Sequence, residues 1–471
     1  MPPRHLLPHL VAGLLVLAAA AFAPAQTSTT ENTLFAAPTG MNEIEKAGDL
    51  SRFQYVIVNA FDHELIGRLK AKNPQTKLFV YKDMASTRSY ACRGGVDDAL
   101  LPTGVAYCDT SARHPDWFTT DPAGNRIEWS PFPGSWQMDV GNPAYQDAWA
   151  ENVLQELRRY RWDGVFIDNA SVDHDDFYFP GRAMQEYPTQ ASYQAATRSF
   201  LARVGPRLLA EGFHVLPNIQ THPKLATPAL WADWTQFTSG GVHGYWMRWD
   251  NGVSFGGDYW LQLQEIFEQQ QRAGKLFLTG TPADDAASMR WGRASFLIGW
   301  NGGPAGYGVG TWHPEWTIEI GTPSGPRYQV GSAWRREYTG GTAIANISDR
   351  QPQTVALGGS YQHPDGSLVS AVTLPPLSGL VLRKVAGAPT VGPSQPPPSP
   401  SAQTRTPASA TPAQTALPRG PESARPRDEA TPSAAPKRRP SVARTLRWRR
   451  AGHLLDVRDR NRARALTSGH T

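Results

Sequence analysis

The acidic residue that ends the run Gly164-Val165-Phe166-Ile167-Asp168 is the leading candidate for chemistry in this sequence. A short apolar run without alternation is typical of a strand buried on both faces, as in a parallel sheet. Asp168 is the first polar residue at the carboxyl end of that run, the edge that carries the active groups in α/β sheets and barrels. Its carboxylate is therefore either a catalytic group or a helix N-cap. The polar loop that follows, residues 171–176, favours catalysis.

Two further acids, Asp83 and Asp139, each lie at the end of a predicted strand, Lys77–Asp83 and Trp136–Val140. A helix cap or a loop hydrogen bond is the alternative role for both. Because these strands precede the one that carries Asp168, both carboxylates are predicted to point into the same cleft. They are the preferred partners of Asp168 in acid–base or nucleophilic chemistry.

The acidic loop after Asp168 contains Asp173, His174, Asp175 and Asp176, which raises the question of a metal. No ligand set from elsewhere in the chain completes such a site, so a solvated loop is the preferred interpretation. Phosphate-binding loops, serine nucleophile elbows and dinucleotide fingerprints are absent from any strand–turn–helix context. The sequence predicts neither a metal nor a cofactor.

The formal net charge of +5 is unevenly distributed. Residues 387–471 contain 15 Lys and Arg against 5 Asp and Glu, a net charge of +10, which leaves 31 bases against 36 acids, or −5, for the rest. The folded part is mildly acidic, whereas nucleic-acid binding would need a basic face on the fold itself. A nucleic-acid partner is not favoured.

The chain begins like an exported protein. Residues 1–25 combine a weakly basic start, an apolar core and a small-residue cleavage site, which predict a secretory signal peptide; an uncleaved anchor is the alternative. No later stretch is long and apolar enough to cross a bilayer. An even cysteine count in an exported chain predicts a disulfide between Cys92 and Cys108, with two unpaired thiols as the alternative.

Apolar runs and helical patterns alternate from Thr33 to about Thr322 in roughly eight βα units, as a (β/α)₈ TIM barrel requires. Residues 84–137 follow neither period and predict a binding loop or lid. The predicted organisation is a signal peptide (1–25), a barrel (26–322), a small antiparallel β-sandwich-like domain (323–386) and a disordered Pro/Ala/Arg-rich tail (387–471).

Three stretches, Trp117 to Gly124, Met138 to Tyr145 and Trp162 to Asn169, resemble the hypothetical glycosyl hydrolase family 15 of bacterial proteins. A late Tyr307 strand followed by a β module extends the resemblance from about Thr33 to Lys384. The resemblance implies a (β/α)₈ protein distantly similar to polygalactosaminidases and α-amylase-like enzymes, with Asp168 as a catalytic acid at the end of the fourth strand.

Glycoside hydrolysis normally requires two carboxyl groups. Relatives usually have an acid just after the sixth strand, but this chain has His243 and Gly244 there, and Asp250 is the nearest acid. We rank Asp139 and Asp83 above Asp250 as the partner of Asp168. The predicted substrate contacts, which include aromatic faces suited to sugar rings, are Asn169, Asn218, His222, His243, Trp246, Trp249 and Asp250.

Two functions fit these observations. The first is a secreted glycoside hydrolase acting on a poly- or oligosaccharide through Asp168 and a second carboxylate. The alternative is a non-catalytic carbohydrate-binding barrel that lacks the second carboxylate. The presence of a second carboxyl group near Asp168 distinguishes them. A separation of about 5–5.5 Å would indicate a retaining enzyme, and one of about 6.5–9.5 Å an inverting enzyme.

Overall fold

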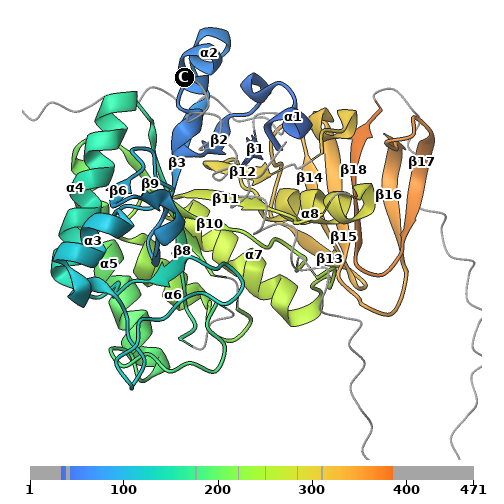
Figure 1. Cartoon of the computed structure of the whole chain (residues 1–471). Helices are drawn as coiled ribbons and strands as arrows, with labels where there is room; N and C mark the ends of the chain where they lie inside the picture. Colours follow the sequence, from blue (N-terminus) through green and yellow to red (C-terminus); the bar gives the residue numbers. More distant parts are fainter. Residues whose placement is uncertain are drawn as a thin grey trace, which may run out of the picture.

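Eight parallel strands close into a barrel in the computed structural model of the chain, as the sequence predicts (Figure 1). The strands follow one another around the barrel in chain order, and the last pairs with the first. They are β1 (Leu34–Ala36), β2 (Tyr55–Val58), β3 (Lys77–Asp83), β8 (Gly164–Ala170), β9 (His214–Ile219), β10 (Gly240–His243), β11 (Leu276–Gly280) and β12 (Ala305–Gly308). The structure describes residues 33–38, 43–174, 178–220, 222–249, 251–283, 285–308 and 311–385.

A helix lies between each pair of consecutive barrel strands. The longest of the early helices, α4, begins where Asn142 accepts hydrogen bonds from the backbone N–H groups of Ala144 and Tyr145, with Pro143 in its first turn. The helices are α1 (Glu43–Ala47), α2 (Leu65–Lys72), α4 (Pro143–Tyr160), α5 (Gln190–Ala210), α6 (Pro228–Thr235), α7 (Gly257–Arg272) and α8 (Ala286–Gly299).

The barrel strands are apolar on both faces because each face is covered. Side chains that point into the barrel form one buried cluster, to which β8 contributes Phe166. Its neighbours Val165 and Ile167 point outward and join the larger core under the helices. Side chains alternate along a strand, so Asp168 follows Phe166 onto the inner face at the end of the barrel.

The chain between β3 and α4 leaves the barrel and forms a separate layer, which we call the β3–α4 excursion (residues 84–142). It contains β4 (Ser86–Arg88), β5 (Cys92–Arg93), β6 (Val96–Asp97), α3 (Tyr107–Arg113) and β7 (Ser135–Gln137). A disulfide joins Cys92 and Cys108, whose Cα atoms lie 5.5 Å apart.

The prediction that Trp136–Val140 is a strand of the barrel sheet is wrong. Residues 135–137 form β7, which pairs antiparallel with β4 in a two-stranded sheet inside the β3–α4 excursion. The place beside β8 is taken by β3 instead, with Asp83 in register with Asp168. A local apolar pattern predicts a strand but does not specify its partner. The partner of β7 is β4, about fifty residues upstream.

Beyond the barrel, six antiparallel strands form a sheet in the order β13-β14-β15-β18-β16-β17. Arg335 on β14 donates hydrogen bonds to the backbone oxygens of Ala356 and Leu357 on β16, so the β16–β17 hairpin curls over one face of the sheet. The strands are β13 (Tyr328–Val330), β14 (Ala333–Tyr338), β15 (Gly341–Asn346), β16 (Gln353–Gln362), β17 (Leu368–Leu374) and β18 (Ser378–Lys384).

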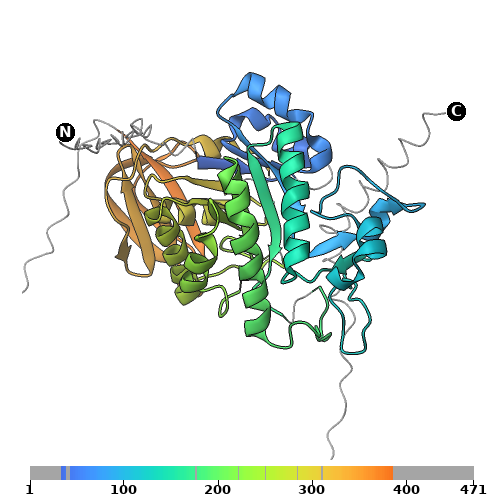
Figure 2. The ribbon, with the colours of Figure 1, turned by 90° about the vertical axis from the view of Figure 1, so that its left-hand side faces the viewer.

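This sheet packs against α8, where Arg336 donates to the backbone oxygen of Ile298 (3.0 Å) and Tyr338 to that of Leu297. Figure 2 shows the C-terminal sheet and the β3–α4 excursion on opposite sides of the barrel. Within the described ranges no helix is long and apolar enough to span a membrane. The predicted signal peptide and the predicted tail lie outside those ranges.

Candidate active site

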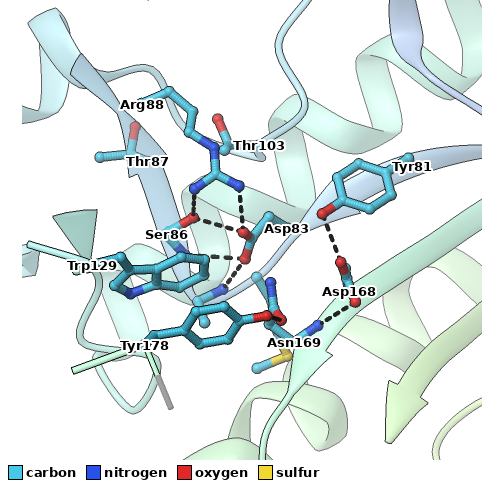
Figure 3. A network of polar contacts seen from close by, with 12 residues as sticks. Tyr81, Asp83, Ser86, Thr87, Arg88, Thr103, Trp129, Asp168, Asn169 and Tyr178 are labelled. Carbon is cyan, nitrogen blue, oxygen red and sulfur yellow. Dashed lines mark hydrogen bonds and ion pairs between the residues drawn. The ribbon is translucent and has the colours of Figure 1, made fainter. Parts of the chain in front are cut away.

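The Asp168 carboxylate lies at the carboxyl end of the fourth barrel strand and accepts three hydrogen bonds. Figure 3 shows those from Tyr81 and from Asn169. The Tyr81 hydroxyl donates to Oδ2 at 2.6 Å, and the Asn218 side-chain amide donates to Oδ1 at 2.8 Å. The backbone N–H of Asn169 donates to the same Oδ1 at 2.9 Å. These donors come from β3, β8 and β9, so three adjacent strands orient the carboxylate.

Tyr81 is a buried phenol that holds one side of Asp168. Burial and the neighbouring Asp168 charge raise its pKa well above the ordinary value. The hydroxyl therefore keeps its proton at neutral pH and acts as a donor. Tyr81 lies two residues after Phe79 on β3, and both belong to the cluster inside the barrel, so its side chain is on the inner face.

Asp83 lies beside Asp168 in the sheet but does not face the pocket. Its side chain is fully buried and accepts hydrogen bonds from Ala85 N (2.8 Å) and from the Ser86 hydroxyl (2.6 Å). Arg88 forms an ion pair with it at 2.8 Å. Burial raises the pKa of the Asp83 carboxyl, and the Arg88 guanidinium opposes that rise. The assignment of Asp83 as a catalytic partner is therefore corrected, because its oxygens are used in holding the start of the β3–α4 excursion.

The Asp168 carboxylate opens into a pocket with about 500 Å³ of empty volume. Tyr81, Asp168 and Asn169 line the side that belongs to the barrel. Most of the remaining lining comes from the β3–α4 excursion and includes Arg88 and Trp129. The segment predicted to be a binding loop or lid thus contributes to the lining of this pocket.

Trp129 and Tyr178 form an aromatic wall opposite Asp168 (Figure 3). Their rings are stacked, with centroids 4.0 Å apart and an interplanar angle of 11°. The Tyr178 hydroxyl donates to the Asn169 side-chain oxygen at 2.9 Å. The aromatic wall is thereby linked to the residue next to Asp168.

Of the residues predicted to contact substrate, Asn169 and Asn218 lie at Asp168. Asn169 has the left-handed φ of 62°, a conformation that asparagine tolerates better than most residues. Gly244, at the end of the sixth strand, lies close to the same group, since a Cβ added there would be 3.3 Å from Asn218 Oδ1. The position after the sixth strand thus faces the partner of Asp168 but offers no carboxyl group.

Asp139 belongs to a different cluster. Its Oδ1 accepts a hydrogen bond from the Tyr187 hydroxyl and another from Gly141 N (3.2 Å). Burial raises the pKa of Asp139, the Tyr187 hydrogen bond lowers it, and the nearby Glu186 raises it. The expectation that Asp139 shares a cleft with Asp168 is corrected, because the strand before it is not part of the barrel and Asp139 does not line the pocket.

Two of the predicted substrate contacts are core residues. Trp246 is fully buried, and its indole N–H donates to the backbone oxygen of Gly292. His243 is also fully buried, and burial lowers its pKa to about 3. Neither side chain can touch a sugar in this structure, because both are completely buried. These two assignments are corrected.

The other predicted contacts differ in accessibility. Trp249 is half-buried on the loop after β10, between Tyr245 and Phe255. His222 uses its Nδ1 atom to accept hydrogen bonds from the backbone N–H groups of Lys224 and Leu225. Asp250 lies outside the described residues, as do Asp175 and Asp176.

Sequence reasoning did not select Tyr81, Arg88, Trp129 or Tyr178 as site residues. Tyr81 could have been selected from the sequence, because side chains alternate along a strand and Tyr81 lies on the same face of β3 as Phe79. Arg88 lies on a strand of only three residues, and Trp129 and Tyr178 lie outside helices and strands, so no periodic pattern marked them.

Residues 70–342 match the hypothetical glycosyl hydrolase family 15. No curated protein matches the chain. Among solved structures, the glycoside hydrolase domain of PelA from Pseudomonas aeruginosa is 14% identical, with 61% of this chain and 96% of that chain covered and a TM-score of 0.38.

Two other solved structures are similarly distant. The α-galactosidase from Lactobacillus brevis is 10% identical, with 75% of this chain and 55% of that chain covered (TM-score 0.41). An α-amylase from Malbranchea cinnamomea is 11% identical, with 74% and 89% covered (TM-score 0.40). The family match includes β3, the β3–α4 excursion and Asp168 and spans more than half of the sequence, and on that ground this chain belongs to the hypothetical glycosyl hydrolase family 15.

Proposed function

We propose that this chain is an exported glycoside hydrolase that cleaves O-glycosidic bonds of a poly- or oligosaccharide, with Asp168 as its reacting carboxylate. The observation that carries this proposal is the setting of Asp168, at the carboxyl end of the fourth barrel strand in a pocket with an aromatic wall. Flat aromatic faces beside polar groups suit pyranose rings. The predicted signal peptide and the Cys92–Cys108 disulfide support export, because disulfides persist in oxidising compartments.

The hydrogen bonds suggest which half of the reaction Asp168 performs. Tyr81, Asn169 and Asn218 all donate to it, so the carboxylate acts as an acceptor. This arrangement suits a nucleophile that attacks the anomeric carbon, or a base that takes a proton from the attacking water. A second carboxyl group must then protonate the departing glycosidic oxygen.

We propose that the proton donor is Asp173 or Asp250, which follow the fourth and the sixth barrel strands in the sequence. Asp173 is half-buried five residues after Asp168, with its backbone N–H bound to the Gln220 side chain (3.1 Å). Asp250 follows the half-buried Trp249 in the sequence. Both replace Asp139 and Asp83 as preferred partners, because those two carboxylates are engaged elsewhere.

The proposal is tested by incubating the purified protein with neutral, N-acetylated, amino and uronic acid polysaccharides and measuring new reducing ends. Asp168→Asn should lower turnover by a factor of about 10³ or more while glycan binding persists. Of Asp173→Asn and Asp250→Asn, the variant that removes the proton donor should lower turnover by a comparable factor. Asp233→Asn, which removes an exposed acid paired with Arg198, is the matched control and should leave turnover unchanged.

A second function is favoured by one observation, the absence of a carboxyl group at Gly244 beside Asn218. The protein would then be a carbohydrate-binding barrel without hydrolytic activity. Native protein that binds a glycan of the panel but never releases reducing ends would support this second function. The same result would overturn the hydrolase proposal.

A further inference from the structure

Tyr178 makes contacts in three directions at the edge of the pocket. Its ring stacks on Trp129 and also contacts Phe132, with centroids 5.7 Å apart. Its backbone oxygen accepts a hydrogen bond from Ser130 N (2.8 Å). Its hydroxyl donates to Asn169 Oδ1 (2.9 Å). Tyr178 therefore joins the β3–α4 excursion to the end of β8.

Trp129 packs against one face of the Tyr178 ring. The indole is only 2% exposed, and the Arg88 guanidinium lies over its ring at 5.3 Å. Its N–H donates to the Gln137 side chain at 2.8 Å, which fixes the plane of the ring. Tyr178 is half-buried and lines the pocket, so it is the more accessible ring of the stacked pair.

The Tyr178 hydroxyl acts on Asp168 through one residue. Asn169 adopts a left-handed backbone, and its N–H points at Asp168 Oδ1. The hydrogen bond from Tyr178 holds the Asn169 side chain and with it this backbone turn. Loss of the hydroxyl would loosen the donor that orients the carboxylate while leaving the ring in place.

The charges of the pocket limit what can bind there. Among the described residues that line the pocket, Arg88 is the cation, and its guanidinium is already used by Asp83 and Ser86. Asp83, Arg88 and Asp168 together contribute a net charge of −1. An acidic substituent on a sugar would meet this negative charge, and the part of the lining that the structure describes offers no spare cation to neutralise it.

We propose that Tyr178 is the substrate platform of this pocket and a positioning residue for Asp168, and that it receives a pyranose ring without acidic substituents. The ring of Tyr178 supplies the stacking surface, and its hydroxyl sets the orientation of Asp168 through Asn169. The positioning role of Tyr178 rests on the proposed function, whereas its role as a platform requires only that a sugar enters the pocket.

The test uses the full chain in two forms. Binding is measured by isothermal titration in the Asp168→Asn background, with oligosaccharides of neutral hexose, N-acetylhexosamine, hexosamine and uronic acid. In this background Tyr178→Ala should weaken binding of the best ligand about tenfold, and Tyr178→Phe less than about twofold. Uronic acid oligosaccharides should bind least well to the native protein, in which Asp168 keeps its charge.

In the active background, Tyr178→Phe should lower kcat about three- to tenfold with little change in KM. Asn169→Gly should behave similarly, since glycine keeps the left-handed backbone and its N–H. Tyr178→Ala should also raise KM. Tyr328→Phe removes an equally hydrogen-bonded hydroxyl on the distant β13 strand and is the matched control, without effect on either constant.

The platform is overturned if Tyr178→Ala binds as tightly as its parent, if no oligosaccharide of the panel binds, or if uronic acid chains bind best. The positioning role is overturned if Tyr178→Phe keeps the native kcat. A protein that binds through Tyr178 but cleaves no glycan would refute the hydrolase proposal and the positioning role, and would leave the platform established.

Discussion

The buried ion pair between Asp83 and Arg88 borders the pocket, whose lining includes Arg88. Within the turn after β3, the backbone N–H of Ala85 and the Ser86 hydroxyl also donate hydrogen bonds to the Asp83 carboxylate. Breaking a buried pair leaves the remaining charge without compensation, and this costs much more than losing an exposed pair. The pair therefore stabilises the junction between the barrel and the β3–α4 excursion.

We expect Asp83→Asn to lower the free energy of unfolding by about 3–5 kcal/mol, measured by urea denaturation. Asp147→Asn is the matched control: this acid pairs with Arg203 and Arg207 on the surface, and its loss should cost no more than about 1 kcal/mol. Equal losses for the two variants would show that the buried pair has no special role.

His243 is a neutral residue of the core between Trp231 and Trp246. Burial lowers its pKa from 6.5 to about 3 in the folded protein. Between these values the unfolded chain binds a proton that the folded protein does not, so the free energy of unfolding falls as pH drops. The stabilising contribution is complete above pH 6.5 and is lost progressively toward pH 3.

The slope of this loss approaches about 1.4 kcal/mol per pH unit. We expect His243→Gln to make the free energy of unfolding less dependent on pH from 6 to 4, as measured by urea denaturation at successive pH values. His363→Gln, on a partly exposed histidine paired with Asp365, serves as the control. An unchanged slope in His243→Gln would contradict the assignment.

At the scale of elements, the β3–α4 excursion has little regular structure of its own. The Cys92–Cys108 disulfide joins β5 to α3 and closes a loop of 16 positions. A loop of that size stabilises the fold by about 3 kcal/mol when closed, through the entropy of the unfolded chain. The disulfide begins two residues after the pocket-lining Tyr90.

We expect the double variant Cys92→Ser/Cys108→Ser to melt at a lower temperature than the native protein in differential scanning calorimetry. A thiol reductant should lower the melting temperature of the native protein and leave the double variant unchanged, because the variant has no bond to reduce. The prediction fails if the reductant does not affect the native protein under conditions that reduce the disulfide.

At the scale of the whole molecule, the C-terminal sheet and the predicted tail should contribute very differently to the stability of the fold. The sheet covers α8 through Arg336 and Tyr338, so its removal would expose buried surface. The predicted tail, residues 387–471, is polar, rich in proline and poor in aromatic residues, and such sequences do not bury enough surface to fold.

Deletion of residues 387–471 should leave the melting temperature and glycan turnover unchanged, while the formal net charge goes from +5 to −5. Deletion from residue 323 onward is the matched comparison and should destabilise the protein strongly, because it also removes β13 to β18. Thermal unfolding and the reducing-end assay measure both outcomes. A large fall in melting temperature for the shorter deletion would mean that the tail contacts the fold.

The sequence by itself determined the barrel, the antiparallel strands after it and the place of Asp168 at a strand end. Strands such as Gly164–Ala170 are covered on both faces, and this burial appears locally as an uninterrupted apolar run. Helix starts such as Asn142-Pro143 are equally local, since a cap acts within one turn. These features depend on neighbouring residues and can be predicted without knowing the fold.

Only the tertiary structure decided which side chains meet Asp168. The partner of β7, the burial of His243 and Trp246, and the separation of Asp139 from the pocket depend on contacts between distant segments. Trp129 and Tyr178 are 49 positions apart, on segments without a period, yet they stack at 4.0 Å. Local apolar patterns report whether a residue is buried, but a pocket is made by residues that only the folded chain brings together.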